Sequence, residues 1–365
     1  MKRWAALRLS SDRMKGPHGH DQRPGIAMVG PFMGALLVLC LSLPLHAQQT
    51  SNAGTSAAAF LEIGVGARAM GMGQAFVSLA QDATAMYWNP AGISRIATFE
   101  AMFTYVDWFV DTKYAFTGIV APIPGRGAVG LSVTHFGAAA QPVRIVGQEE
   151  GTGEFYTAQD IALGLTLALN LTNRFSFGLS SKFIRQQIWH TSGQGFAMDV
   201  GVLYKTGLEG MNIGISISNF GSPLQLSGRD LLNVIDPDIL NSGVEKIRVN
   251  YETDPFELPL LARFGLSYQR TLFGEGNHLT VVADLQHPSN DTESINVGAE
   301  LLLMNAVSLR MGANSLLLQD RTGGFSLGGG LVVRSFGAGQ ITLDYAYVDW
   351  GFLRELHYFT VGLAL

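Results

Sequence analysis

The chain has 365 residues, of which 15% are charged and 47% are hydrophobic, and its formal net charge at pH 7 is -5. After the first fifty residues no stretch approaches the ~20 consecutive apolar residues of a membrane-spanning helix, and no basic cluster is typical of a nucleic-acid-binding surface. Glycine, with 44 residues, is costly inside helices but tolerated in strands. The composition therefore excludes a helical membrane protein and a nucleic-acid-binding protein, and it favours a β-rich fold.

The first 47 residues have the features of a secretory signal peptide. Basic residues precede an apolar run over 28–45, and the sequence LHA at 45–47 is typical of a cleavage site. We therefore expect export, with a mature chain that begins near Gln48. Retention as a membrane anchor is disfavoured because Pro31 and Pro44 interrupt the apolar run and no basic stop-transfer cluster follows it.

Residues that could carry chemistry are sparse after this leader. The only cysteine, Cys40, lies inside the leader, so we expect no disulfide, cysteine-ligated zinc or thiol nucleophile in the mature chain. The later histidines lack the spacing of metal ligands; they are His135, His190, His278, His287 and His357. We predict no catalytic residue, no metal and no cofactor, and therefore no enzyme.

The segment 48–97 has a pattern of its own, which is neither a clean strand nor a long helix. Its glycines, among them Gly71 and Gly73, indicate close backbone packing. A nucleotide-binding loop is disfavoured at 71–73, because no clear strand precedes it and the Lys-Ser/Thr pair of such loops is missing. The sequence NPAG at 89–92 is typical of a turn, since proline fixes φ and asparagine caps its own turn. We predict a structural role, rather than direct ligand contact, for Gly71, Gly73, Asn89, Pro90, Ala91 and Gly92.

From Thr98 onward, apolar residues alternate with small or polar ones in segments separated by turn residues, which is the pattern of half-apolar strands. About fourteen strands are predicted, and most have the ~9 to 11 residues needed to cross a bilayer at a tilt. The predicted strands are 98–108, 112–122, 127–136, 157–169, 174–187, 194–206, 211–220, 258–271, 278–287, 294–303, 307–315, 325–334, 339–349 and 355–365. Soluble strands average only ~5 to 6 residues, so the lengths favour an all-β transmembrane antiparallel barrel over 98–365.

The connections between these strands alternate between short and long. If the N-terminus lies inside the cell envelope, the short connections all fall on the periplasmic side, and the long connections 137–156 and 221–257 fall on the outside, as in outer-membrane barrels. We expect both termini on the periplasmic side. The charged loop 221–257 could serve as a protein-binding surface or could simply be solvated.

Charged residues within the predicted strands mostly lie at the alternate positions that otherwise hold small or polar residues. Those positions would face the lumen of a barrel. These residues are Lys182, Asp199, Arg263, Asp284, Glu300, Arg310 and Asp344. We favour a mixed-sign network that braces the lumen over a polar pore, because buried charges are normally paired. Aromatic residues near strand ends are interpreted as interfacial girdles; they include Trp108, Phe109, Tyr114, Tyr204, Tyr347, Trp350 and Tyr358.

The run GARAMGMG at 66–73, followed by Asp82-Ala83 and by WNPAG at 88–92, resembles the signature of the PorV/PorQ family. It is more distantly similar to the N-terminal hatch of the FadL long-chain fatty-acid transporters. The resemblance implies a fourteen-stranded barrel in the bacterial outer membrane, in which the segment 48–97 plugs the lumen.

The resemblance also implies a function and partners. PorV-like proteins are components of the type IX secretion system, and such a barrel receives the C-terminal domains of exported cargo. The expected partners are outer-membrane lipid, secretion-system subunits and cargo C-terminal domains, with no nucleic acid. The alternative is a FadL-like transporter for hydrophobic small molecules, which needs an apolar pocket in the lumen. The sequence leaves the oligomeric state open.

Overall fold

The computed structural model describes residues 54–237, 246–318, 323–335 and 339–365. The predicted signal peptide, the predicted cleavage site and the first residues of the segment 48–97 lie outside these ranges. No helix in the described part of the chain is long and apolar enough to cross a membrane.

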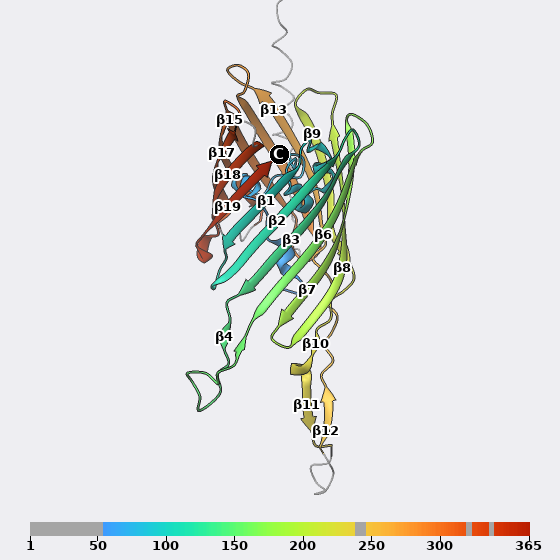
Figure 1. Ribbon diagram of the computed structural model, residues 1–365, viewed down its shortest axis with the longest axis vertical. Helices are drawn as coiled ribbons and strands as arrows, with labels where there is room; N and C mark the ends of the chain where they lie inside the picture. Colours follow the sequence, from blue (N-terminus) through green and yellow to red (C-terminus); the bar gives the residue numbers. More distant parts are fainter. Residues whose placement is uncertain (1–53, 238–245, 319–322, 336–338) are drawn as a thin grey trace, which may run out of the picture. The chain divides into compact units, whose positions relative to one another are not determined.

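Fourteen antiparallel strands form a closed barrel (Figure 1), because β9 pairs with both β13 and β8 and so joins the two ends of the sheet. The strands are β1 (Glu100–Asp107), β2 (Thr112–Ile123), β3 (Gly127–Ala138), β6 (Ala158–Asn170), β7 (Phe175–Ile188), β8 (Thr191–Lys205), β9 (Met211–Gly221), β13 (Leu261–Thr271), β14 (His278–Pro288), β15 (Ser294–Leu303), β16 (Val307–Leu316), β17 (Phe325–Ser335), β18 (Gly339–Asp349) and β19 (Glu355–Ala364). The predicted fold and strand count are confirmed, and the predicted strand ends differ from these bounds by a few residues at most.

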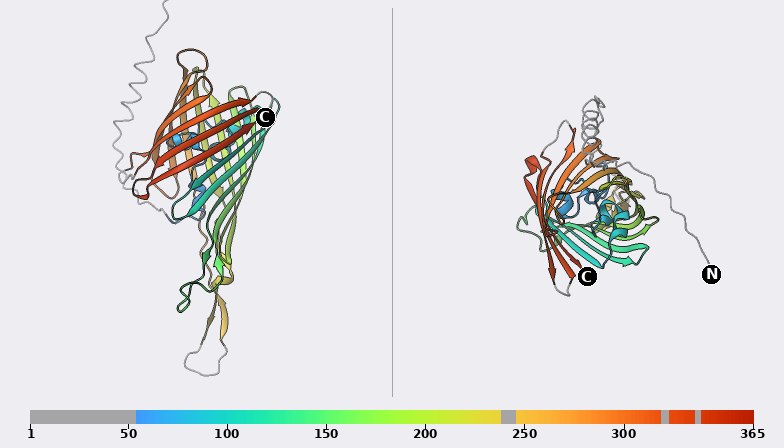
Figure 2. Two further views of the ribbon diagram at one scale, coloured as in Figure 1. Left: turned by 60° about the vertical axis from the view of Figure 1, so that its left-hand side comes forward. Right: turned by 90° about the horizontal axis from the view of Figure 1, so that it is seen from above.

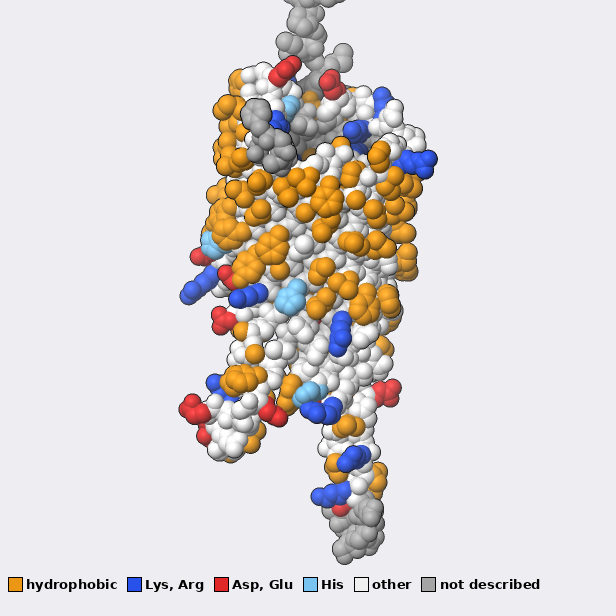
Figure 3. All heavy atoms as spheres, viewed as in Figure 1, with side chains coloured by type: hydrophobic (Ala, Val, Ile, Leu, Met, Phe, Trp, Pro, Cys, Tyr) orange, Lys and Arg blue, Asp and Glu red, His pale blue; other side chains and the backbone are white. Residues whose placement is uncertain are grey.

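Side chains alternate between the two faces of the barrel, as the pattern in the sequence predicts. In β8, Phe196, Met198 and Val200 are exposed on the outside, whereas Ala197 and Asp199 are buried inside. On the face shown in Figure 3, hydrophobic side chains gather in a band over the strands, and polar side chains become more frequent toward the lower end of the view, from which two extended segments project. This band is the surface that would face lipid.

Two of the predicted girdle residues are wrongly assigned. Tyr114 and Tyr358 are fully buried inside the barrel, and the Tyr114 hydroxyl donates a hydrogen bond to the carbonyl oxygen of Ile63 at 3.2 Å. Along β2 and β19 every second side chain points inward, and both tyrosines are at inward positions. This alternation decides their direction, although they lie near strand ends. Trp108 and Trp350 are partly buried and pack edge to face, with ring centroids 5.7 Å apart.

Two extended connections project from one end of the barrel (Figure 1), which we call the long-loop end. The first carries β4 (Gln141–Pro142) and β5 (Phe155–Tyr156), and the second carries β10 (Ser227–Gly228), η3 (Arg229–Leu231), β11 (Leu232–Ile235) and β12 (Ile247–Asn250). The 3-10 helix η4 (Gly351–Leu353) connects β18 to β19. The C-terminus lies at the other end, the short-turn end, where the connections are brief. The two ends differ in loop length as predicted.

The residues 54–96, called the N-terminal segment below, lie within the ring of strands when the barrel is seen from above (Figure 2). The segment contains η1 (Ala59–Glu62), α2 (Ala67–Gly71), α3 (Ala85–Trp88) and η2 (Pro90–Arg95). Most of its residues are buried. The segment therefore fills interior space that would otherwise be open.

The N-terminal segment enters from the long-loop end. The backbone N–H of Ala57 donates to the carbonyl oxygen of Glu257 at 2.9 Å, and that of Ala58 donates to Gln186 Oε1 at 2.9 Å. The acceptors lie in the second extended connection and near the end of β7 that faces it. Ala57 and Ala58 are therefore held at the end opposite the C-terminus. The predicted start of the mature chain, near Gln48, lies outside the described residues, so the periplasmic location of the N-terminus stays a prediction.

Candidate functional site

The candidate site is the interface between the N-terminal segment and the barrel wall, where the predicted motif residues lie. Gly73 has φ +65°, and a Cβ there would lie 2.5 Å from the backbone nitrogen of Ala313 in β16. A Cβ on Gly71 would lie 3.1 Å from the Cα atom of Gly328 in β17. A Cβ at Gly73 would clash with the backbone of β16, and a Cβ at Gly71 would be in a tight contact with the backbone of β17. The Gly73 N–H also donates to Ser326 Oγ at 2.9 Å.

Asn89 forms hydrogen bonds within the N-terminal segment and also to β8 of the wall. Its Nδ2 donates to the carbonyl oxygens of Val77 and Val202, each at 3.0 Å, and its Oδ1 accepts from the N–H of Ala91 at 3.2 Å. The asparagine thus caps η2, which starts at Pro90, as the turn signal predicts.

The wall beside Asn89 is lined by glycine. A Cβ on Gly201 would lie 2.1 Å from Asn89 Oδ1, and a Cβ on Gly178 would lie 2.3 Å from the backbone nitrogen of Ala91. Within the segment, a Cβ on Gly92 would lie 2.2 Å from the carbonyl oxygen of Ala80. Of the six motif residues, Gly71 and Gly73 lie against β16 and β17, and Asn89, Pro90 and Ala91 lie against β7 and β8. Gly92 packs within the N-terminal segment.

A buried ion-pair network joins the N-terminal segment to the wall between β15 and β18. Arg310 Nε donates to Glu300 Oε2 at 2.6 Å, and its Nη1 donates to Asp344 Oδ1 at 2.6 Å. Arg68 reaches the same Glu300 carboxylate, with 2.7 Å between Nη2 and Oε1, and it lies 3.7 Å from Asp82. The mixed-sign network predicted for the lumen is present, and Arg68 and Asp82 extend it into the N-terminal segment.

Burial affects the pKa values of Arg68 and Asp82, the two residues of the N-terminal segment that join this network. Burial raises the pKa of Asp82, although the guanidinium of Arg68 and a hydrogen bond from Thr84 oppose that rise. Burial lowers the pKa of Arg68, but the Glu300 carboxylate has the opposite effect, and the net pKa of Arg68 is raised. Arg68 therefore remains a cation inside the barrel.

Other wall carboxylates accept hydrogen bonds from the backbone of the N-terminal segment. Asp284 Oδ2 accepts from the N–H groups of Phe76 and Val77 at 2.6 and 2.9 Å, and Glu100 Oε1 accepts from that of Ala83 at 2.7 Å. These bonds satisfy backbone donors that the irregular segment cannot pair internally. Sequence reasoning missed Glu100, because its contact with a distant loop leaves no local signal.

Lys182 pairs within the wall, and Arg263 contacts aromatic rings. Lys182 Nζ lies 2.6 Å from Asp199 Oδ2 and donates to Asn219 Oδ1 at 2.8 Å. The Arg263 guanidinium carbon lies 5.1 Å from the centroid of the Trp88 ring, which is a cation–π distance. All seven charged residues predicted for the lumen thus point inward.

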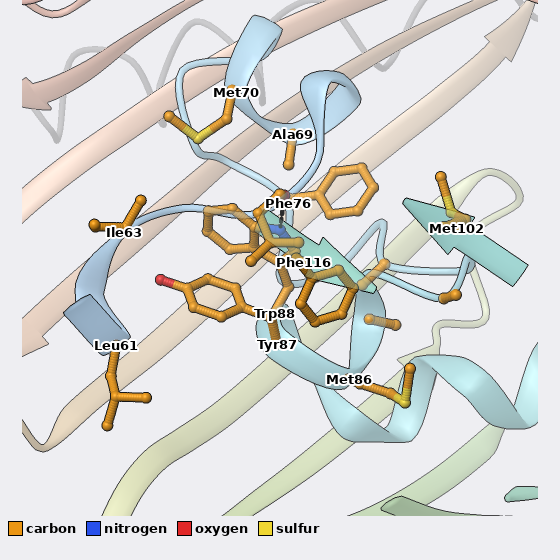
Figure 4. Close-up of a cluster of buried hydrophobic side chains, with 14 of the residues drawn as sticks. Leu61, Ile63, Ala69, Met70, Phe76, Met86, Tyr87, Trp88, Met102 and Phe116 are labelled. Carbon is orange, nitrogen blue, oxygen red and sulfur yellow. Dashed lines mark hydrogen bonds between the residues drawn. The ribbon is translucent and has the colours of Figure 1, made fainter. Parts of the chain in front are cut away.

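Apolar side chains of the N-terminal segment occupy much of the remaining interior. Figure 4 shows Phe76, Met86 and Trp88 close to Phe116 of β2 in one buried cluster. A cavity of about 20 Å³ lies beside this cluster, between Tyr87 and Lys182. About 10 to 15 Å³ of such volume holds one water, whereas an apolar cavity that is known to bind benzene has a volume of about 150 Å³. This cavity therefore has room for water but not for an aromatic hydrocarbon.

The described residues contain no group of three or more His, Cys, Asp or Glu residues that could hold a metal ion. The contacts observed between the N-terminal segment and the wall are hydrogen bonds, ion pairs and apolar packing. These interactions fix one arrangement of the segment inside the barrel.

These features define the class of protein, an outer-membrane antiparallel β-barrel whose interior holds its own N-terminal segment. Similar solved structures include the CymD monoaromatic hydrocarbon channel, with a TM-score of 0.52 and 12% sequence identity over 82% of this chain and 96% of that chain. They also include the Pseudomonas putida toluene transporter TodX, with a TM-score of 0.50 and 13% identity over 82% of this chain and 96% of that chain. At such identities the likeness concerns the fold.

Residues 46–212 match the family described as Type IX secretion system protein PorV. The matched part contains the whole N-terminal segment and the strands β1 to β8. The resemblance to PorV-type barrels is therefore confirmed, and it includes the motif residues that contact the wall. No curated protein matches the chain.

Proposed function

We propose that the protein is a PorV-type component of the type IX secretion system, which binds exported cargo or other secretion subunits at its long-loop end. The match of residues 46–212 to the PorV family carries this proposal. The occupied interior supports it, because a barrel filled by its own N-terminal segment is suited to work through its surface. We also propose that residues 48–97 act as a plug that keeps the lumen closed.

The hairpin formed by β11 and β12 is a suitable contact surface for a protein. Leu232, Val234, Ile247 and Tyr251 are exposed on it. A two-stranded hairpin is marginally stable by itself, and its open edges can pair with a strand of a partner. The base of this connection is anchored to the barrel, because His190 N–H donates to Asp230 Oδ2 at 3.0 Å. The barrel thus holds an exposed apolar hairpin away from its own wall.

A pull-down from membranes tests the proposal. The tagged protein is expected to recover secretion subunits or cargo that carries the C-terminal signal domain. Replacing four exposed hairpin residues, Leu232, Val234, Ile247 and Tyr251, by serine should lower that recovery several-fold. A matched control replaces four exposed apolar residues of the short-turn end, Leu171, Leu208, Phe273 and Met304, by serine. Equal recovery from both variants would contradict a role for the hairpin, and recovery of lipid alone would contradict secretion.

The second candidate is a transporter for hydrophobic small molecules, which the FadL-like fold favours. CymD and TodX are described as a hydrocarbon channel and a toluene transporter. For this chain, the cavity beside Tyr87 has a volume of only about 20 Å³, so a hydrocarbon does not fit there with the N-terminal segment in its present position. Uptake of a radiolabelled hydrocarbon that depends on this protein would support the transporter.

A further inference from the structure

On β3, β6, β7 and β8, the side chains that point outward change from apolar to polar along the strands. The change takes place from one outward position to the next, which is two residues further along each strand. In one row of register partners, Val133, Leu163, Phe183 and Phe196 point outward, and the rings of the two phenylalanines are 5.3 Å apart. The next outward row toward the long-loop end contains His135, Ile161, Arg185 and Gln194. The row after that contains Gln159 and Gln187.

A shallow groove lies on this polar border. Gln159, Ile161, Arg185 and Gln187 line it, and its volume is about 80 Å³. Arg185 Nη2 donates to Gln187 Oε1 at 3.2 Å. No carboxylate in the described part of the chain forms a salt bridge with Arg185. The groove therefore presents an uncompensated guanidinium between two amide side chains, with an aliphatic side chain beside them.

A second cation lies close by on the same border. Lys113 of β2 is the register partner of Gly137, and Gly137 is in turn the partner of Gln159. Lys113 is thus two strands away from Gln159, or about 10 Å at the usual strand spacing. Gly137 itself has no side chain, and the His135 ring of the same strand lies beside it, with Cε1 3.4 Å from the place that a Cβ on Gly137 would take.

We propose that this groove binds the phosphate of a membrane lipid in the leaflet at the long-loop end. A guanidinium matches the geometry of phosphate and binds it with two parallel hydrogen bonds, and the glutamine amides can donate further ones. The apolar row starts one register step away, at Leu163 and Phe183. A lipid with its phosphate on Arg185 can therefore lay its acyl chains along that row, which a free phosphate cannot do.

Native mass spectrometry of the full protein in detergent tests this proposal, with bis-phosphorylated lipid A as the probe. The parent protein should bind it, and Arg185→Gln should bind about tenfold more weakly, as expected for the loss of a bidentate charged contact. Arg174→Gln is the matched control, because Arg174 is exposed in a turn of the short-turn end. Heat-modifiable migration on a gel checks that both variants are folded.

Two further measurements show whether the groove binds a lipid phosphate or free phosphate. Lipid A from which both phosphates have been removed should bind no better to the parent than to Arg185→Gln. Inorganic phosphate at millimolar concentration should not displace the intact lipid. The proposal is overturned if Arg185→Gln and the parent bind intact lipid A equally, if the dephosphorylated lipid binds as tightly as the intact one, or if inorganic phosphate displaces it.

Discussion

Arg310 lies between two carboxylates inside the barrel, and its side chain has almost no contact with solvent. It donates to Glu300 and Asp344, both at 2.6 Å. Removing one member of a buried ion pair leaves the remaining charge uncompensated, which typically costs about 3–5 kcal/mol. At this position two carboxylates would lose their partner, although Arg68 would still contact Glu300.

Arg310→Ala is therefore expected to lower the free energy of unfolding by about 3 kcal/mol or more. Urea-induced unfolding in detergent, followed by the loss of heat-modifiable migration, measures this change. Arg174→Ala, in an exposed turn, serves as the control and should change the stability little. A stability of Arg310→Ala equal to that of the control would show that the network does not brace the interior.

A second prediction for single residues concerns the side chains that point outward from the strands. Leu165 is 53% exposed on the outer face of β6 and lies in the apolar band. Leu165→Arg places a charge in hydrocarbon at a cost of about 2–4 kcal/mol near the midplane. Leu208→Arg, at an exposed position in a turn of the short-turn end, should cost far less. The yield of folded barrel compares the two variants, and equal yields would mean that Leu165 does not face lipid.

The inward or outward direction of single side chains is largely predictable from the sequence, because the period of a strand is two residues. That parity correctly places Lys182 and Asp284 inside. It would also have placed Tyr114 and Tyr358 inside had it been applied to the strand ends. Partners such as Arg68 with Glu300 are not predictable, since residues 232 positions apart leave no local pattern.

At the level of elements, the N-terminal segment is held by close backbone contacts on two sides. Gly201 and Gly178 of the wall leave space for Asn89 and Ala91, and Gly328 leaves space for Gly71. A larger residue at such a contact must displace the segment, because a packed interior has little room to relax.

Gly201→Val is predicted to loosen η2 from the wall. Its Cβ would meet Asn89 Oδ1 at 2.1 Å, and overpacking of this kind typically costs about 1–3 kcal/mol. Limited trypsin digestion should then cleave after Arg95 or Arg68 faster than in the parent protein. Gly207→Val is the control, since a Cβ at Gly207 meets nothing within 4 Å. Unchanged cleavage in Gly201→Val would contradict the tight contact.

The strands could be predicted because alternation and turn residues repeat fourteen times along the chain. The course of the N-terminal segment could not, since it is set by bonds to distant strands such as those from Phe76 and Val77 to Asp284. Its entry from the long-loop end also depends on Glu257 and Gln186, which no local signal connects to Ala57 and Ala58.

For the whole molecule, the filled interior makes a prediction about conductance. Deleting residues 54–96 removes the side chains that occupy the lumen, while the closed ring of strand pairs remains. The buried charges of the wall would then be hydrated, so the barrel should still insert into membranes. Conductance across planar bilayers should rise several-fold above that of the parent protein, as expected for an unplugged barrel of this strand number. Unchanged conductance would contradict a plugging role.

If the protein acts in secretion through its surface, as proposed above, the N-terminal segment can stay in place while the protein works. A covalent bond between the segment and the wall tests this. The N–H of Ala67 donates to Thr360 Oγ1 at 2.9 Å, so Ala67→Cys and Thr360→Cys bring two thiols close together. The only native cysteine, Cys40, lies in the predicted leader. The two single-cysteine variants control for the substitutions themselves.

The strain used for the test has a single copy of the protein, and this copy carries the disulfide. The amount of cargo displayed on the cell surface is measured. A non-reducing gel gives the fraction of the protein that is cross-linked. Display at the level of the single-cysteine controls is expected even when most of the protein is cross-linked. Loss of display in proportion to cross-linking, with the controls unaffected, would contradict it and would show that the segment must move for the protein to function.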